Sequence, residues 1–185
     1  MNNKYFFFWL FIVTLIGCKD DILPKPKAML RLDYANGVAK ELEIDCHYSF
    51  DYNQIATMKA SNNCSLTLGY PMMKGSIFIT YKKVNGNLNT LLSDAQKLSY
   101  EHAIKADKIL PYPFANEEGK VYGMFYEIEG DAASQAQFYV TDSINHFVTG
   151  SLYFSTKPNY DSIFPAAVYL QKDVRRIMET FRWKE

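Results

Sequence analysis

The sequence predicts an α+β fold in which a mainly antiparallel sheet is covered by two helices. Three observations lead to this prediction. Segments with period-2 alternation of apolar residues occupy both halves of the chain, one stretch with helical periodicity separates them, and a second closes the sequence. With 185 residues, of which 48% are hydrophobic, the chain is long enough to bury a core of its own.

The first eighteen residues have the pattern of an export signal. One cationic residue, Lys4, precedes an apolar run over 5–16, which is shorter than the roughly 20 residues that a membrane-spanning helix needs. The run ends in Leu15-Ile16-Gly17-Cys18, which resembles the lipobox of bacterial lipoproteins. In that family a peptidase cuts before the cysteine, which then carries diacylglycerol on sulfur and an acyl group on its new amino terminus. The resemblance implies a signal peptide at 1–17 and a lipid on Cys18.

Residues 18–27 are expected to form a stalk behind this anchor. Lys19-Asp20-Asp21 resembles a signal that sends some lipoproteins of gliding bacteria to the outer leaflet of the outer membrane, and it is equally consistent with a solvated charged spacer. Pro24 and Pro26 favour extended chain. No linker or repeat divides the remainder, so we expect residues 28–185 to form one globular domain.

Strands dominate the expectation for the first part of this domain. Apolar side chains alternate with polar ones from Ala28 to Tyr34, and again where Tyr48, Phe50 and Tyr52 are separated by Ser49 and Asp51. We expect strands over residues 28–34, 41–45, 47–52, 55–59, 64–70 and 76–84.

The periodicity then becomes helical over residues 88–110. Its apolar stripe includes Leu91, Ala95 and His102, and Pro111 and Pro113 are expected to end the helix. Three strands follow, at about 120–129, 135–142 and 146–156.

A last helix is expected from about Ser162 to Trp183. Asp161 is its expected N-cap, with Pro165 in the first turn. The face expected to be buried consists of Ala167, Leu170, Val174, Ile177 and Phe181. The resulting order of elements is loosely like that of the PsbP/Mog1 α/β/α sandwiches, an analogy without functional content.

Short motifs along nearly all of the chain after Cys18 share their spacing with one known family. They include Leu30-Arg31-Leu32-Asp33, Asp45-Cys46, Tyr70-Pro71, and the stretches 77–81, 102–107, 137–143, 150–154 and 178–181. With these motifs the chain resembles the gliding-motility lipoproteins of the GldD family. His47 departs from the pattern, which would have proline in this turn. The resemblance implies an envelope lipoprotein required for gliding, whose machinery is coupled to type IX secretion, and it implies no catalytic residues.

Cys46 and Cys64 are the cysteines that remain once Cys18 is lipidated. In an oxidising compartment an even pair favours a disulfide, and two buried free thiols are the alternative. The loop from one cysteine to the other has 19 residues. A bridge closing it would stabilise the fold by about 3 kcal/mol.

Histidines are the other candidates for chemistry. His47, His102 and His146 are dispersed, without the spacing of metal ligands, and His102 is expected to be a hydrogen-bonded core histidine. Asp142, Ser143 and His146 are neighbours in sequence, but their spacing does not define a catalytic triad, and no Gly-x-Ser-x-Gly elbow is present. We therefore expect neither catalytic residues nor a metal or cofactor.

Two Asp-Ser-Ile motifs centre on Ser143 and Ser162. Both resemble the signal for O-glycosylation of exported proteins in gliding bacteria. Asp-Ser pairs are also favoured in turns and helix caps for local hydrogen bonding, so this structural interpretation stays open.

Two classes of function remain. The first is a non-catalytic accessory or assembly component of the gliding and secretion machinery, anchored in the cell envelope, with the outer membrane expected and the leaflet open. The second is a periplasmic small-ligand carrier or hydrolase of the same fold. Nucleic acid is not an expected partner, because 20 basic and 20 acidic residues balance and the isoelectric point is about 6.8.

Overall fold

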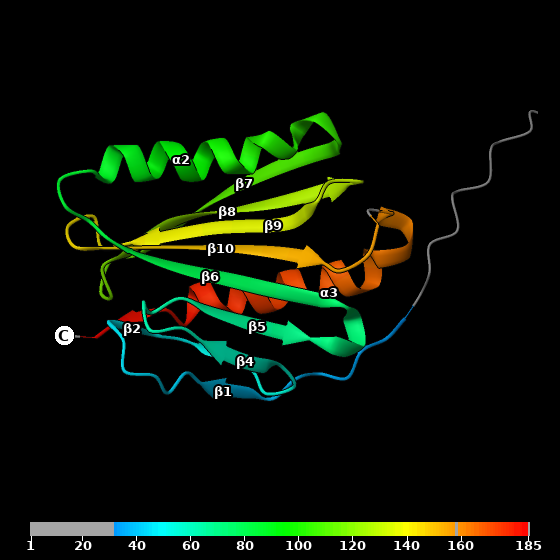
Figure 1. Cartoon of the computed structure of the whole chain (residues 1–185), viewed down its shortest axis with the longest axis horizontal. Helices are drawn as coiled ribbons and strands as arrows, with labels where there is room; N and C mark the ends of the chain where they lie inside the picture. The colour runs from blue at the N-terminus through cyan, green and yellow to red at the C-terminus, as the bar shows by residue number, and fades with distance from the viewer. Residues whose placement is uncertain (1–31, 158, 185) are drawn as a thin grey trace, which may run out of the picture.

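The computed structural model describes residues 32–157 and 159–184, apart from the side chain of His102 (Figure 1). The predicted signal peptide, the lipid site Cys18 and the stalk at 18–27 lie outside these residues. No helix in the described part of the chain is long and apolar enough to cross a membrane.

A seven-stranded sheet forms the centre of the fold, and every neighbouring pair of its strands is antiparallel. Across the sheet the order is β4 (Thr57–Ala60), β5 (Leu66–Tyr70), β6 (Gly75–Lys83), β10 (His146–Phe154), β9 (Ser134–Thr141), β8 (Val121–Gly130) and β7 (Ala106–Asn116). Two small antiparallel pairs accompany it, β1 (Ala39–Glu41) with β3 (Asp51–Asn53) and β2 (Tyr48–Ser49) with β11 (Arg182–Trp183).

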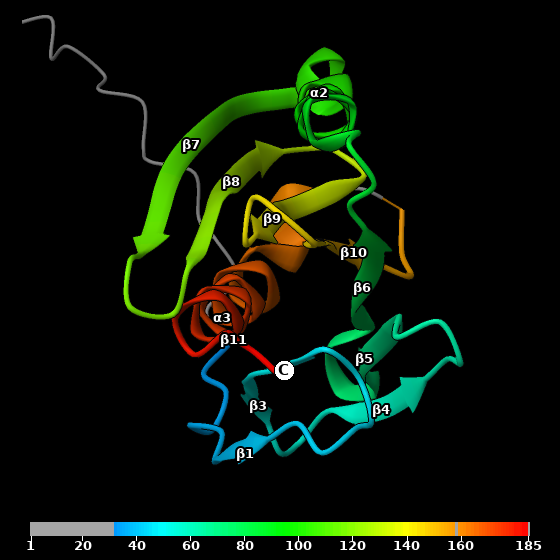
Figure 2. The same cartoon turned by 90° about the vertical axis from the view of Figure 1, so that its left-hand side faces the viewer.

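The two α-helices of the described residues cover opposite faces of this sheet. On β10, Phe147 packs with Leu91 and Ala95 of α2 (Leu88–Tyr100). Its neighbour Val148 belongs to the main core, which contains the inner face of α3 (Tyr160–Glu179). Successive side chains of a strand point to opposite faces, so α2 and α3 lie on different sides. Figure 2 shows the sheet curling around α3. The predicted fold class is confirmed.

The first predicted helix is too long by ten residues. Its end at Leu110 is wrong, because α2 ends at Tyr100, a 3₁₀ turn η2 follows at Glu101–Ile104, and residues 106–116 form strand β7. Pro111 and Pro113 lie within that strand. This is possible because β7 is the edge of the sheet, where one side of the strand makes no ladder hydrogen bonds. Long-range pairing with β8 decided the outcome, which local periodicity could not show.

The ends of the last helix also differ from the prediction. Its N-cap is Asn159, whose side chain accepts a hydrogen bond from the Ser162 N–H, rather than Asp161, and Pro165 lies in the helix interior. Trp183 is in strand β11, not in the helix. The expected inner face is nevertheless buried throughout: Ala167, Leu170, Val174, Ile177 and Phe181.

The remaining strands confirm the expectations to within a few residues, except near the beginning. Residues 32–38 are not a strand, so the described part of the strand expected over 28–34 is wrong. The strand expected at 41–45 is replaced by the exposed β1, which ends at Glu41. The segment 47–52 is divided between β2 and β3, because Tyr48 pairs with the C-terminal β11 and Tyr52 pairs with β1.

Candidate functional site

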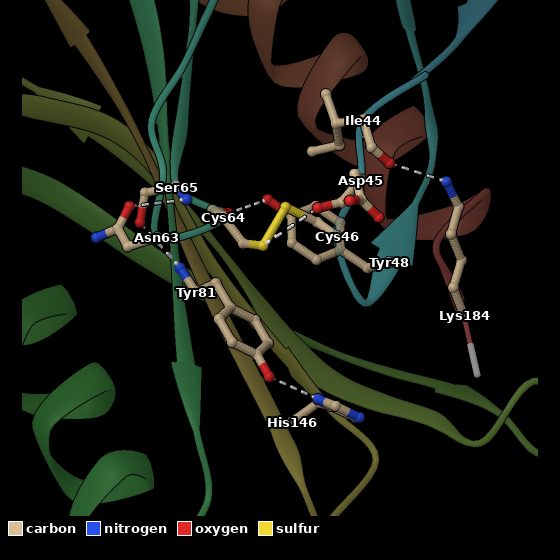
Figure 3. The surroundings of a disulfide bond; sticks show 10 residues. All are labelled: Ile44, Asp45, Cys46, Tyr48, Asn63, Cys64, Ser65, Tyr81, His146 and Lys184. Carbon is tan, nitrogen blue, oxygen red and sulfur yellow. Dashed lines mark hydrogen bonds between the residues drawn. A yellow bond between two sulfur atoms is a disulfide. The ribbon is translucent and has the colours of Figure 1, made fainter.

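Four aromatic rings gather where β6 ends and β10 begins, and we call them the histidine cluster: His47, Tyr81, His146 and Trp183. The ring of His146 stacks on the rings of both His47 and Trp183, and the ring centroids are 5.2 Å apart in each pair. The hydroxyl of Tyr81 is 2.8 Å from Nδ1 of His146, a contact visible in Figure 3. The cluster is partly exposed, with His47 the most open to solvent.

The end of the chain holds the cluster together. Phe181, between α3 and β11, is buried, and the centroid of its ring lies 4.8 Å from that of the Trp183 ring. The indole N–H of Trp183 donates to the Lys120 carbonyl at 3.1 Å, and the Lys184 N–H donates to the His47 carbonyl at 2.8 Å. The cluster therefore joins four regions far apart in sequence, around His47, Tyr81, His146 and Trp183.

A disulfide between Cys46 and Cys64 lies beside the histidine cluster, with 5.6 Å between the two Cα atoms (Figure 3). It links the segment before β2 to the β4–β5 connection. The hydroxyl of Tyr48 donates to the Cys64 carbonyl at 2.6 Å, so the same connection is held by a second bond. Figure 3 also shows Lys184 reaching the Ile44 carbonyl on the other side of the bridge.

The carboxylate of Asp142 is hydrogen-bonded to the backbone of the turn that leads into β10. Its Oδ1 accepts hydrogen bonds from the backbone N–H groups of Ile144, Asn145 and His146 at 2.8–3.0 Å. Burial by itself would raise the pKa of Asp142, but these donors, and after them the His146 ring, hold that pKa below its usual range. Ser143 is exposed, in the left-handed region at φ 68°. Asp142, Ser143 and His146 thus share a turn, in which Asp142 binds backbone and His146 binds Tyr81.

The pKa of His146 is lowered from its usual value of 6.5. Burial is the main cause, and the nearby His47 and Lys83 act in the same direction, while Asp142 opposes them. The neutral imidazole is therefore favoured near pH 7. Burial also raises the pKa of Tyr81, with Asp142 adding to the effect, so its hydroxyl stays protonated and able to donate.

A pocket of about 330 Å³ lies between α3 and the segment that enters the domain, and its lining includes Tyr34, Val168 and Asp173. Asp173 is only 4% exposed. Its carboxylate accepts from the Asn53 amide at 2.9 Å and lies 3.7 Å from Nη1 of Arg176. Burial raises the pKa of Asp173, while Asn53, Tyr70 and Arg176 oppose this.

Sequence reasoning missed this pocket. Asp173 follows Leu170 by three residues and precedes Ile177 by four, so it falls on the buried face of α3 and a signal for it was present. Asn53 had no such signal, because its contact with Asp173 spans 120 residues. Tyr81 and Trp183 were likewise missed as members of the histidine cluster.

The other predicted residues are placed as follows. Ser143 and Ser162 are both exposed. The backbone of His102 lies in η2, beyond the end of α2. The apolar stripe of the helix, which predicted a core histidine, therefore does not extend to His102. The structure does not describe the His102 side chain. Within residues 32–157 and 159–184, no three His, Cys, Asp or Glu side chains are grouped as metal ligands.

Comparison with protein families places the chain among lipoproteins of gliding motility, through a match that covers residues 19–183. The family is that of the gliding motility lipoprotein GldD, and the chain belongs to it. The resemblance noted in the sequence is thereby confirmed. No curated protein sequence matches the chain.

Proposed function

We propose that this protein is an envelope component anchored in the outer membrane through lipid on Cys18, and that it serves gliding by binding other proteins of the gliding and type IX secretion machinery. Membership of the GldD family supports the connection with motility and with lipid anchoring. The binding role is our inference from the side chains.

The observation that carries the binding role is the state of the candidate catalytic groups. Oδ1 of Asp142 accepts hydrogen bonds from three backbone N–H groups. The ring of His146 is stacked between those of His47 and Trp183, and its Nδ1 is hydrogen-bonded to the Tyr81 hydroxyl. A general base needs a free nitrogen facing the proton that it removes, and Nδ1 of His146 already faces the Tyr81 hydroxyl. These contacts instead tie the β9–β10 turn to β6 and to the chain end, which suits a rigid surface for a protein partner.

Gliding of strains that carry only a variant protein tests this proposal. His47→Ala, His146→Ala and Ser143→Ala should each leave most movement intact when the protein is normally abundant. Loss of one contact at the rim of a binding surface usually costs under about 1 kcal/mol. Loss of a catalytic acid or base costs about 10²-fold or more in rate. A His146→Ala protein that is folded, abundant and unable to support gliding would overturn the binding role.

The pocket beside Asp173 supports a second candidate, the binding of a small polar ligand. It combines a buried carboxylate with a volume of about 330 Å³, which falls at the lower end of the range of small-molecule sites. Val168→Trp should fill it, and Val168→Ala is the matched control. If gliding survives the tryptophan variant at normal abundance, the pocket is not required. Loss of gliding in that variant alone would favour the ligand carrier.

A further inference from the structure

Two large apolar side chains project almost completely into solvent: Met72 is 94% exposed and Ile104 is 92% exposed. Met72 lies in a 3₁₀ turn, η1 (Pro71–Met73), between β5 and β6. The turn is held in place, because the Lys74 N–H donates to the Pro71 carbonyl at 3.1 Å and the Ser155 N–H donates to the Lys74 carbonyl at 2.8 Å. Its other methionine, Met73, is buried. The exposed position of Met72 is thus fixed by ordered backbone.

Strand register places both side chains at the same end of the sheet. Gly75, which follows η1, pairs with Phe154 at the end of β10, and Tyr153 pairs with Ser134 at the start of β9. Across β8, Gly130 pairs with Ala106, which follows η2. Met72 and Ile104 therefore lie in two connections at the same end of the sheet, one before β6 and the other before β7, with β10, β9 and β8 between these strands. Figure 1 shows this end on the right, opposite the C-terminus, and His146 of the histidine cluster pairs with Lys83 at the other end of β6 and β10.

The chain enters the domain at this end. Tyr34 lines a hollow together with Met72 and Lys74 and with Asn159 and Ser162 at the start of α3. The described chain begins on the right of Figure 1, close to the β5–β6 turn. Leu32, its first residue, follows Cys18 by 14 positions and is itself exposed. A lipid on Cys18 would hold this end near the bilayer.

Charge at this end is nearly balanced. Its basic side chains include Lys74, Lys105 and Lys157, and its acidic ones include Glu101, Asp131 and Asp161. Attraction to anionic lipid is therefore not the main force available, whereas exposed Met and Ile can enter the apolar edge of a bilayer. Because a tether raises the effective concentration of the domain at the surface, a contact too weak for a free protein is sufficient.

We infer that the end bearing Met72 and Ile104 faces the bilayer, with both side chains in its interfacial region, and that the histidine cluster points away from the membrane. This orientation rests on the lipid anchor of the proposed function. It leaves the disulfide and the chain end as the surface presented to other envelope proteins.

The test uses the full lipidated protein in phosphatidylcholine vesicles, with an environment-sensitive thiol probe at Met72→Cys or Ile104→Cys. The matched control is Ile144→Cys, since Ile144 is 69% exposed on the β9–β10 turn at the opposite end. Cys46 and Cys64 are joined to each other and do not take the probe. Unchanged thermal unfolding of each variant checks the fold.

We expect probes at positions 72 and 104 to shift to shorter emission wavelengths on vesicles and to be quenched by spin-labelled lipid at least about two-fold more than the probe at position 144. High salt should change this little. Equal responses at both ends, or none in protein that floats with the vesicles, would overturn the orientation alone. Failure of the wild-type protein to float would instead overturn the anchor. Probes that respond only in whole envelopes would assign the surface to a protein partner and overturn the inference.

Discussion

Tyr81 and His146 form a diagonal pair across β6 and β10, joined by a 2.8 Å hydrogen bond between the phenol and Nδ1. His146 pairs directly with Lys83, so Tyr81, two residues earlier on β6, lies on the same face of the sheet. The bond secures the β9–β10 turn, which carries Ser143, to a central strand. It requires a neutral imidazole if the phenol donates, which agrees with the lowered pKa of His146.

Stability should fall on mild acidification because of His146. Between its lowered pKa and 6.5 the unfolded chain binds more protons than the folded one, so the free energy of unfolding decreases as the pH falls through this window and is fully retained above it. Denaturant titrations at several pH values around 6.5 measure the effect. His146→Gln should flatten the slope.

Asp142→Asn is the matched control for that experiment. Asn keeps an oxygen for the three backbone donors and leaves His146 in place, so the slope near pH 6 should persist. The contribution of Asp142 itself, whose pKa is lowered from 3.8, is present above that value and is lost as the pH falls through the lowered pKa. A His146→Gln protein with an unchanged slope would assign the pH dependence to another group.

Loss of the disulfide should destabilise the protein. Replacing Cys46 and Cys64 together by serine opens a 19-residue loop and is expected to lower the free energy of unfolding by about 3 kcal/mol. Thiol trapping of denatured wild type should find both side chains unreactive until a reductant is added. A reductant should destabilise the wild type and leave the double variant unchanged. Two reactive thiols in the untreated mature protein would contradict the bond.

Cys18→Ser should prevent processing and acylation. The expected product is a larger precursor that retains residues 1–17 and does not incorporate a palmitate analogue, because the acceptor sulfur is gone. Gel mobility and metabolic labelling measure these two properties, with the Cys46→Ser, Cys64→Ser double variant as a control that should still be labelled. Normal processing and labelling of Cys18→Ser would remove the basis for the envelope assignment.

Glycosylation at the Asp-Ser-Ile motifs is testable by mass. Ser143 and Ser162 are both exposed, and Ser143 projects from a hairpin turn while Ser162 lies in the first turn of α3. If these motifs carry glycan, Ser143→Ala removes its mass from the peptide that spans the β9–β10 turn, and Ser162→Ala removes it from the peptide at the start of α3. Ser151, which is buried and lacks the motif, is the control. A mature protein whose mass is accounted for by peptide and lipid would leave turn and cap chemistry as the explanation.

Local sequence sufficed wherever one element buries one regular face. The inner face of α3 was read correctly from Leu170, Val174 and Ile177, since a helix packed on a sheet must repeat its apolar residues every three or four positions. The strands of the central sheet, such as β9, were likewise recognisable from alternation and composition. Family membership also followed from sequence, since motif spacing is a property of the chain itself.

Tertiary structure decided what depends on partners distant in the chain. Residues 106–116 form a strand because β8 pairs with them along nearly their whole length, and their two prolines are tolerated because β7 is an edge. Trp183 leaves the helical pattern to pair with Tyr48, 135 positions earlier, and so completes the histidine cluster. Asn53 reaches Asp173 in the same way. Such contacts depend on how sheet, helices and chain ends pack together, and the order of residues along one segment carries little information about that packing.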